Sequence, residues 1–217
     1  MTGPAGGLLG DICIGTNGQL SMSGDQFITG DVRLAPGARF NRSGSTTTGT
    51  VTTNADLSTE ISAALSAAES ASAKACTQTF NSLNGTRTIM GGGGTNVICA
   101  NNVVLQAGQV IRVHGGAGDT FVFKVPGNFV INGGQIVADG VQPKDILFNI
   151  EGTGQQVAFT GGGGGTGCCK ASVDGTLLAP DRKIALSPGR VNGQVISGMD
   201  ISIVSGAAVK CPPPPCP

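Results

Sequence analysis

The chain has 217 residues, with 13 basic and 13 acidic side chains and a formal net charge of zero. Glycine accounts for 37 of the 217 residues, a share far above the usual value of about 7%. The chain contains no tryptophan or tyrosine, and only 12% of its residues are charged. The balanced charge argues against a nucleic-acid-binding surface, and the many aliphatic residues exclude an intrinsically disordered chain. The length suits a single domain with a sizeable core.

The first eleven residues, MTGPAGGLLGD, lack a charged segment followed by a long apolar run, so we expect no signal peptide. No apolar stretch approaches the about 20 residues that a membrane-spanning helix needs. Two acceptor triplets for N-linked glycans occur, NRS at Asn41 and NGT at Asn84. They would be used only in a eukaryotic secretory pathway.

A strand–turn–strand phrase occurs three times along the chain, as VRLAPGARF (32–40), VVLQAGQVI (103–111) and IALSPGR (184–190). Each copy has a leucine followed three residues later by a glycine. We expect the leucines to point into a core and the glycines to turn the chain at a corner. A chance recurrence of a common turn signal is the alternative. The pairs are Leu34 and Gly37, Leu105 and Gly108, and Leu186 and Gly189.

One segment, residues 54–80, contains neither glycine nor proline and is rich in alanine. Its apolar residues recur at spacings of three and four, which predicts a long helix over about residues 55–78, of about six turns, capped by Asn54. Because the apolar stripe is narrow, we expect the helix to lie along another element rather than inside a bundle. The stripe consists of Leu57, Ile61, Leu65 and Ala68.

The rest of the chain consists of short apolar runs separated by glycine-containing turns. Most runs span three to five residues, which is short for a hairpin sandwich but suits a parallel β-helix whose stacked coils bury an aliphatic column. Since the repeated strand–turn–strand phrases are unevenly spaced along the chain, we predict an irregular solenoid. The runs are FVFKV (121–125), FVI (129–131), QIVA (135–138), ILFNI (146–150), QVAFT (156–160), GTLLA (175–179), KIAL (183–186), QVIS (194–197) and ISIV (201–204).

The seven cysteines favour disulfides, because no Cys-x-x-Cys pattern occurs and the single histidine cannot complete a usual zinc site. Disulfides place the chain in an oxidising, extracellular setting. The odd number leaves at least one thiol free or paired between chains, and the connectivity stays open. The candidates are Cys13, Cys76, Cys99, Cys168, Cys169, Cys211 and Cys216.

Nothing in the sequence predicts a catalytic, cofactor or metal site. The glycine runs 91–95 and 161–167 are not followed by the Lys-Ser/Thr pair of a phosphate loop, so we expect surface loops there. His114 ends a predicted strand, and the chain contains no Gly-x-Ser-x-Gly nucleophile motif, so we expect a solvated side chain. A carbohydrate-active β-helix would need carboxylates paired across coils, for which the candidates are Asp139, Asp145, Asp174 and Asp181.

Threonines could instead order water into an ice-like lattice if they lay on a flat strand face at a fixed repeat. The threonine-rich segment, residues 43–54, is one continuous run, so its hydroxyl groups are not expected to stack from coil to coil. The other positions expected to face outward carry a mixture of side chains. The sequence therefore predicts no flat threonine array. These outward positions are Lys124, Gln156, Arg182 and Arg190.

The order of these segments, over about residues 9–208, resembles the ice-binding-like domain family and the related choice-of-anchor A surface domains. The most specific part is GTLLAP, followed by a strand and GRVNGQVISG. The resemblance implies a discontinuous β-helix with a long helix alongside, secretion and no catalysis. The matching segments are ITGDVRLAPGA (28–38), ADLSTEISAALSAA (55–68), GDTFVFKV (118–125), DILFNIEG (145–152) and GTLLAPDRKIALSPGRVNGQVISG (175–198).

We therefore expect a mainly β chain with one β-helix domain over residues 1–210 and a proline-rich tail over 211–217, a surface-attachment linker or an ordinary disordered tail. The leading hypothesis is a non-enzymatic, secreted or cell-surface module that acts in adhesion or self-assembly, because β-helix ends expose unpaired strand edges. Ice binding is the alternative, and a carbohydrate-active β-helix is the third. Expected partners are further copies, ice or an extracellular polysaccharide surface, without cofactor or nucleic acid.

Overall fold

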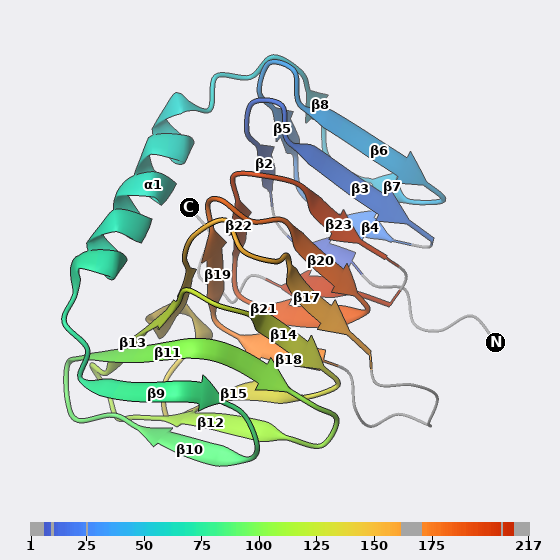
Figure 1. Cartoon of the computed structure of the whole chain (residues 1–217). Helices are drawn as coiled ribbons and strands as arrows, with labels where there is room; N and C mark the ends of the chain where they lie inside the picture. The colour runs from blue at the N-terminus through green and yellow to red at the C-terminus, as the bar shows by residue number, and fades with distance from the viewer. Residues whose placement is uncertain (1–6, 10, 25, 162–170, 205, 211–217) are drawn as a thin grey trace.

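The computed structural model describes residues 7–9, 11–24, 26–161, 171–204 and 206–210. Short parallel strands wind into a three-sided solenoid, and one α-helix, α1 (Ser58–Ala73), lies along its flank (Figure 1). This arrangement confirms the predicted mainly β architecture with a helix alongside. The tail at 211–217 and most of the second glycine run, residues 162–167, lie outside the described residues.

Each full coil gives one strand to each side of the solenoid. The side beside α1, here the helix side, contains the first half of β11 (Thr95–Leu105), β13 (Thr120–Val125), β16 (Ile146–Ile150), β19 (Thr176–Ala179), β22 (Val195–Ser197), β2 (Ile12–Ile14), β5 (Val32–Leu34) and β8 (Val51–Thr52). A short 3-10 helix, η1 (Pro143–Asp145), precedes β16.

The second side, here the flat face, contains the second half of β11, β14 (Phe129–Asn132), β17 (Val157–Thr160), β20 (Ile184–Ser187), β23 (Ile201–Ile203), β3 (Gln19–Ser23) and β6 (Arg39–Ser43). Strand β9 (Gln78–Leu83) pairs with β11.

The third side, here the charged side, contains β10 (Arg87–Met90), β12 (Val110–His114), β15 (Gln135–Asp139), β18 (Ala171–Asp174), β21 (Gly189–Asn192), β24 (Ala208–Lys210), β1 (Gly7–Leu9), β4 (Phe27–Ile28) and β7 (Thr46–Thr47).

The coils do not stack in the order of the chain. The N-terminal coils stack on the C-terminal coil, because β1 pairs with β24 and β3 pairs with β23. Helix α1 then carries the chain to the opposite end, where β9 and β10 begin (Figure 1). Its 16 residues span about 24 Å at about 1.5 Å per residue, which matches five strand spacings of about 4.8 Å between the coils of β6 and β14. The β-helix is therefore discontinuous, as the family resemblance implied.

The core is one continuous column of inward side chains. Leu34, Leu105 and Leu186 are all buried, as the repeated phrase predicted. Aromatic rings extend the column across several coils: the Phe123 and Phe148 rings stack with centroids 4.7 Å apart, and Phe129 meets Phe148 edge-on at 5.5 Å. The repeat thus marks corners, but not equivalent ones: Leu34 precedes the corner from the helix side to the flat face, and Leu105 and Leu186 precede corners from the flat face to the charged side.

The three corner glycines do not serve the same purpose. Gly37 and Gly108 have φ values of +78° and +81°, which confirms the prediction that they turn the chain. Gly189 instead begins strand β21, and a Cβ atom there would lie only 2.5 Å from Cβ of Phe159. The prediction of a turn at Gly189 is therefore wrong: glycine is needed there because two coils approach closely.

Helix α1 is shorter than the predicted 55–78. Asn54 does not cap it but has a left-handed backbone with φ of 56°, and the carboxylate of Asp56 accepts a hydrogen bond from the Ser58 N–H. At the other end Lys74 is extended, since the chain must turn into β9. The periodicity of the sequence predicted where the helix lies, but it could not predict the two ends, because tertiary contacts determine them.

Candidate functional site

A column of short side chains runs up the middle of the flat face. Each member lies directly opposite the next across a parallel ladder, and each is half-buried by its neighbours rather than extending into solvent. Inward residues on both sides of each member are buried, so the column is held in place by the core. From the α1 C-terminal end upward the column consists of Val104, Val130, Ala158, Ala185, Ser202 and Ser21.

A second column, two residues further along each strand, carries hydroxyl and amide groups. Asn132, Thr160 and Ser187 lie opposite one another on β14, β17 and β20. The Thr160 hydroxyl donates to Oδ1 of Asn132 at 3.1 Å, and Nδ2 of Asn132 donates to Oε1 of Gln106 at 3.0 Å. These bonds from coil to coil restrict the rotamers, so the polar groups keep fixed positions.

Charged groups on this face lie near its edge with the helix side. Lys183, just before β20, forms an ion pair of 2.7 Å with Asp200, just before β23. Toward the β6 end, Nε2 of Gln19 donates to the hydroxyl of Ser21 at 2.6 Å. The middle of the face therefore combines methyl and hydroxyl groups without a formal charge on any member of the central column.

The strand geometry sets two repeats on this face. Successive coils are about 4.8 Å apart, and alternate outward residues along a strand are about 6.6 Å apart. Strands β14, β17, β20, β23, β3 and β6 stack in this order along one side of the solenoid, away from α1 (Figure 1). A regular grid of small groups can fit an extended, regular surface.

No pattern in the sequence revealed this face. Its members come one from each coil, so the pattern appears only when the ladder register is known. As expected, the threonine-rich run does not stack from coil to coil, because it passes around the solenoid: Ser43 lies on the flat face, Thr46 and Thr47 on the charged side and Thr52 on the helix side. The face is built instead from single alanine, serine and threonine residues far apart in the chain.

Two of the residues expected on an exposed, mixed surface have structural roles. Arg182 is only 1% exposed, so its predicted outward position is wrong. Its guanidinium fills a corner between coils and donates to the carbonyl oxygens of Pro126, Gly127, Glu151 and Gly152. Burial lowers the pKa of this guanidinium. Gln156 and Arg190 are exposed as predicted.

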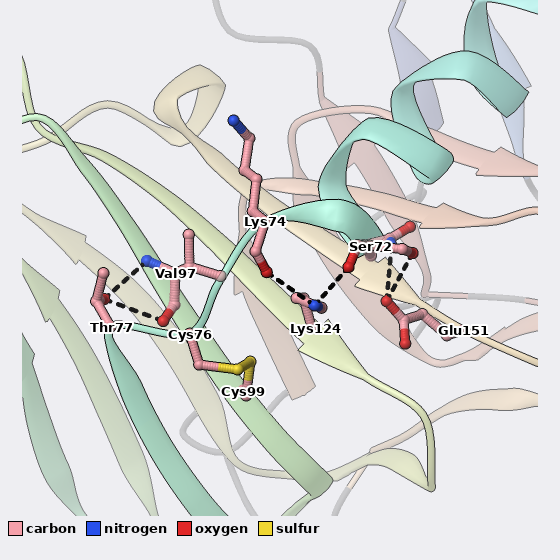
Figure 2. Close-up of a disulfide and its surroundings, with 9 residues drawn as sticks. Ser72, Lys74, Cys76, Thr77, Val97, Cys99, Lys124 and Glu151 are labelled. Carbon is pink, nitrogen blue, oxygen red and sulfur yellow. Dashed lines mark hydrogen bonds between the residues drawn. A yellow bond between two sulfur atoms is a disulfide. The ribbon is translucent and has the colours of Figure 1, made fainter.

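Lys124 docks the end of α1 (Figure 2). Its ammonium donates to the carbonyl oxygens of Ser72 at 2.6 Å and Lys74 at 3.0 Å, which are acceptors left free at a helix C-terminus. The Ser72 hydroxyl donates to Glu151 at 2.7 Å, and buried Asn149 donates to the Ala68 carbonyl. Arg33 holds the other end of the helix through an ion pair of 2.6 Å with Glu60.

The disulfide prediction is confirmed for one pair. Cys76 and Cys99 are bonded with Cα atoms 5.7 Å apart, which ties the segment after α1 to β11 (Figure 2). Cys13 is an exposed residue with a free thiol on the helix side, and partial burial of its sulfur raises the pKa of the thiol while Arg33 opposes the shift. The other candidates, Cys168, Cys169, Cys211 and Cys216, lie outside the described residues.

The candidate carboxylates do not gather into one site. Asp139 and Asp174 lie on neighbouring strands of the charged side, whereas Asp145 ends η1 and Asp181 lies in the corner before β20. Asp139 contacts His114, which is solvent-exposed as predicted, at 3.1 Å. Asp174 accepts a hydrogen bond from the Ala138 N–H. Within the described part of the chain, no group of three or more His, Cys, Asp or Glu side chains could hold a metal ion.

The first glycine run, residues 91–95, lies mostly exposed at a corner, as expected for a surface loop, and hydrogen bonds hold it in place. The carboxylate of Asp119, 8% exposed, accepts hydrogen bonds from the N–H groups of Gly93 at 2.9 Å and Gly116 at 2.8 Å. The amide of Asn96 donates to the same carboxylate at 3.0 Å. These bonds, led by that from Gly116, hold the pKa of Asp119 below its usual value, so this polar cluster holds the corner together.

A family model described as an ice-binding-like adhesive domain matches residues 5–199, most of the chain. No curated protein sequence matches. No helix of the described residues is long and apolar enough to cross a membrane.

Solved structures of ice-binding proteins share the fold. The protein from an Arctic yeast is 18% identical with a TM-score of 0.61, over 97% of this chain and 92% of its own. One from an Antarctic biological consortium is 15% identical with a TM-score of 0.60, over 94% and 86%. One from the Antarctic ascomycete Antarctomyces psychrotrophicus is 19% identical with a TM-score of 0.51, over 95% and 93%.

Proposed function

Because this chain belongs to the family of ice-binding-like adhesive domains, we propose that it is a non-catalytic, extracellular module that adheres to an extended solid surface through its flat face. The observation that carries the proposal is the central column, which repeats one short side chain per coil from Val104 to Ser21. A disulfide between Cys76 and Cys99 supports an oxidising, extracellular location.

Ice is the surface that this geometry favours. Methyl groups of Ala158 and Ala185 alternate with the hydroxyl groups of Thr160 and Ser187 on a rigid grid, so they can hold ordered water at fixed spacings. The ice-binding proteins that share the fold support the same choice. A polysaccharide is less favoured, because sugar rings bind by stacking on aromatic side chains, and the phenylalanines of β14 and β17 point into the core.

The test is a bulky substitution in the middle of the flat face. Ala185→Tyr places a large ring above neighbouring coils and prevents close contact with a flat surface, while the strand backbone and core stay unchanged. We expect thermal hysteresis of the variant to fall by about tenfold at equal concentration, because the ring holds the rest of the face away from the surface. Ice shaping in a cold-stage microscope should be lost in parallel.

A matched control is Ser172→Tyr, which adds the same ring to a half-buried position on β18 of the charged side. We expect this variant to keep the activity of the unmodified protein, and both variants to keep its circular dichroism spectrum. Equal activity of the Ala185→Tyr variant and the unmodified protein would show that the flat face does not bind ice. The absence of any hysteresis in the unmodified protein would remove ice as the surface.

Self-association through the solenoid ends is a second candidate activity. Among the described residues, terminal strands β6, β7 and β8 at one end, and β9 and β10 at the other, each pair with a neighbour on one side only. Their free backbone groups can pair with strands of another copy. We expect the unglycosylated chain to form larger species in sedimentation velocity as concentration rises. A single monomer peak over the whole concentration range would contradict this activity.

A further inference from the structure

Both ends of the solenoid carry an arginine over the last aromatic ring of the core. At the β6 end the guanidinium of Arg42 lies 5.9 Å from the ring centre of Phe40, and at the β9 end that of Arg87 lies 5.6 Å from Phe80. These contacts cover the apolar end of the core. They do not pair the outer backbone groups of the terminal strands, which no other strand of the described part of the chain covers, so strand addition can occur there.

The two N-glycan acceptor triplets fall on these same two ends. Asn41 lies on the terminal strand β6, is exposed and faces outward opposite Ser21. Asn84 is exposed in the turn between β9 and β10, the two strands at the opposite end, where Gly85 has a φ of +72°. The full length of the solenoid thus separates the triplets, and each lies within three residues of an arginine that covers the core.

We propose that Asn41 and Asn84 carry N-linked glycans and that these glycans close the two ends of the solenoid against strand addition by a second copy. The side-chain amide nitrogen of each asparagine forms a bond to C1 of the first sugar of a lipid-pyrophosphate-linked oligosaccharide. The bond between C1 and the pyrophosphate oxygen breaks, the lipid pyrophosphate leaves with the electron pair, and the amide nitrogen loses one proton.

Both glycans would attach outside the central column of the flat face, which ends at Ser21. Asn41 faces outward from β6, one strand beyond Ser21, so a glycan there stands at the margin of the face and its bulk hinders the approach of a further strand to β6. The same compartment that forms the Cys76–Cys99 disulfide in a eukaryotic cell also attaches N-linked glycans. The inference rests on the proposed self-association through the solenoid ends, and not on which surface the flat face binds.

Site occupancy is measured on the full chain secreted from yeast behind a secretion leader. Digestion with an amidase that releases N-glycans, performed in water labelled with oxygen-18, converts each occupied asparagine to labelled aspartate. Peptide mass spectrometry should then find the label at residues 41 and 84 in most molecules. Secreted protein without label at either residue would overturn the proposal. Asn101, exposed but outside any acceptor triplet, is the internal control.

The effect on the ends is measured by sedimentation velocity before and after trimming with an endoglycosidase that leaves one sugar on each asparagine. We expect a monomer before trimming and at least about a doubling of the weight-average mass afterwards. Asn41→Gln and Asn84→Gln variants should each associate without trimming, because each leaves one end open. An unchanged mass in trimmed protein and in both variants would overturn the role of the glycans as end covers.

Discussion

Replacing Arg182 by alanine is expected to lower the free energy of unfolding by about 3 kcal/mol or more, because several buried carbonyl oxygens lose their donor at once. The guanidinium donates to carbonyls of the corners before β14 and after β16, including Gly127 and Gly152, so it joins three successive coils. Urea denaturation followed by circular dichroism measures the loss. Within the described residues the hydrogen-bond partners of this guanidinium are all carbonyl oxygens, so these oxygens balance its burial.

The matched control for this substitution is Arg190→Ala on the charged side. Arg190 is exposed, so its removal should change the free energy of unfolding by less than about 0.5 kcal/mol. Equal stability of the Arg182→Ala and Arg190→Ala variants would contradict the account of the corner. A lower yield of soluble Arg182→Ala protein, together with unchanged stability of the Arg190→Ala variant, agrees with it.

Removing the disulfide by joint Cys76→Ser and Cys99→Ser substitution should cost about 3 kcal/mol, since the bond closes a loop of 23 residues in the unfolded chain. The loss should be accompanied by faster hydrogen exchange in the C-terminal turn of α1, because the segment after the helix is then held by hydrogen bonds alone. Differential scanning calorimetry and exchange mass spectrometry measure the two effects.

Cys13→Ser is the control for the disulfide variant, because Cys13 is an exposed free thiol on the helix side. It should leave both the melting temperature and the exchange of α1 unchanged. A melting temperature of the double variant equal to that of the Cys13→Ser variant would show that the disulfide does not stabilise the fold.

The existence and approximate place of most strands could be predicted from the sequence. Apolar runs such as 121–125 and 146–150 correspond to β13 and β16 because fully buried strands need apolar residues at nearly every inward position. The repeated leucines also lay inward as predicted. The positions of these strands and leucines could be predicted because buried positions carry apolar residues, and such residues are visible in the local sequence.

The stacking order and the register could not be derived from local composition. Pairing of β3 with β23 joins residues near opposite ends of the chain, and no local pattern encodes that contact. The flat face depends on this register, since Ser21 and Ser202 become neighbours only through it. The family resemblance supplied the discontinuous topology but not the residues of the face.

Polar residues were the least predictable, because their roles depend on tertiary contacts. Lys124 and Arg182 both occupy positions where a basic residue normally faces solvent, yet one docks a helix end and the other fills a corner between coils. The ends of α1 were misplaced for the same reason, because Arg33 and Lys124 fix them from distant strands.

The most direct measurement is the distribution of the protein, fused to a fluorescent protein at its C-terminus, on a hemisphere of single-crystal ice growing in a dilute solution. Binding through the flat face predicts that the fluorescent fusion is incorporated into the ice and that the Ala185→Tyr fusion stays in the liquid. Exclusion of both fusions from the ice, or equal incorporation of both, would contradict an ice-binding flat face.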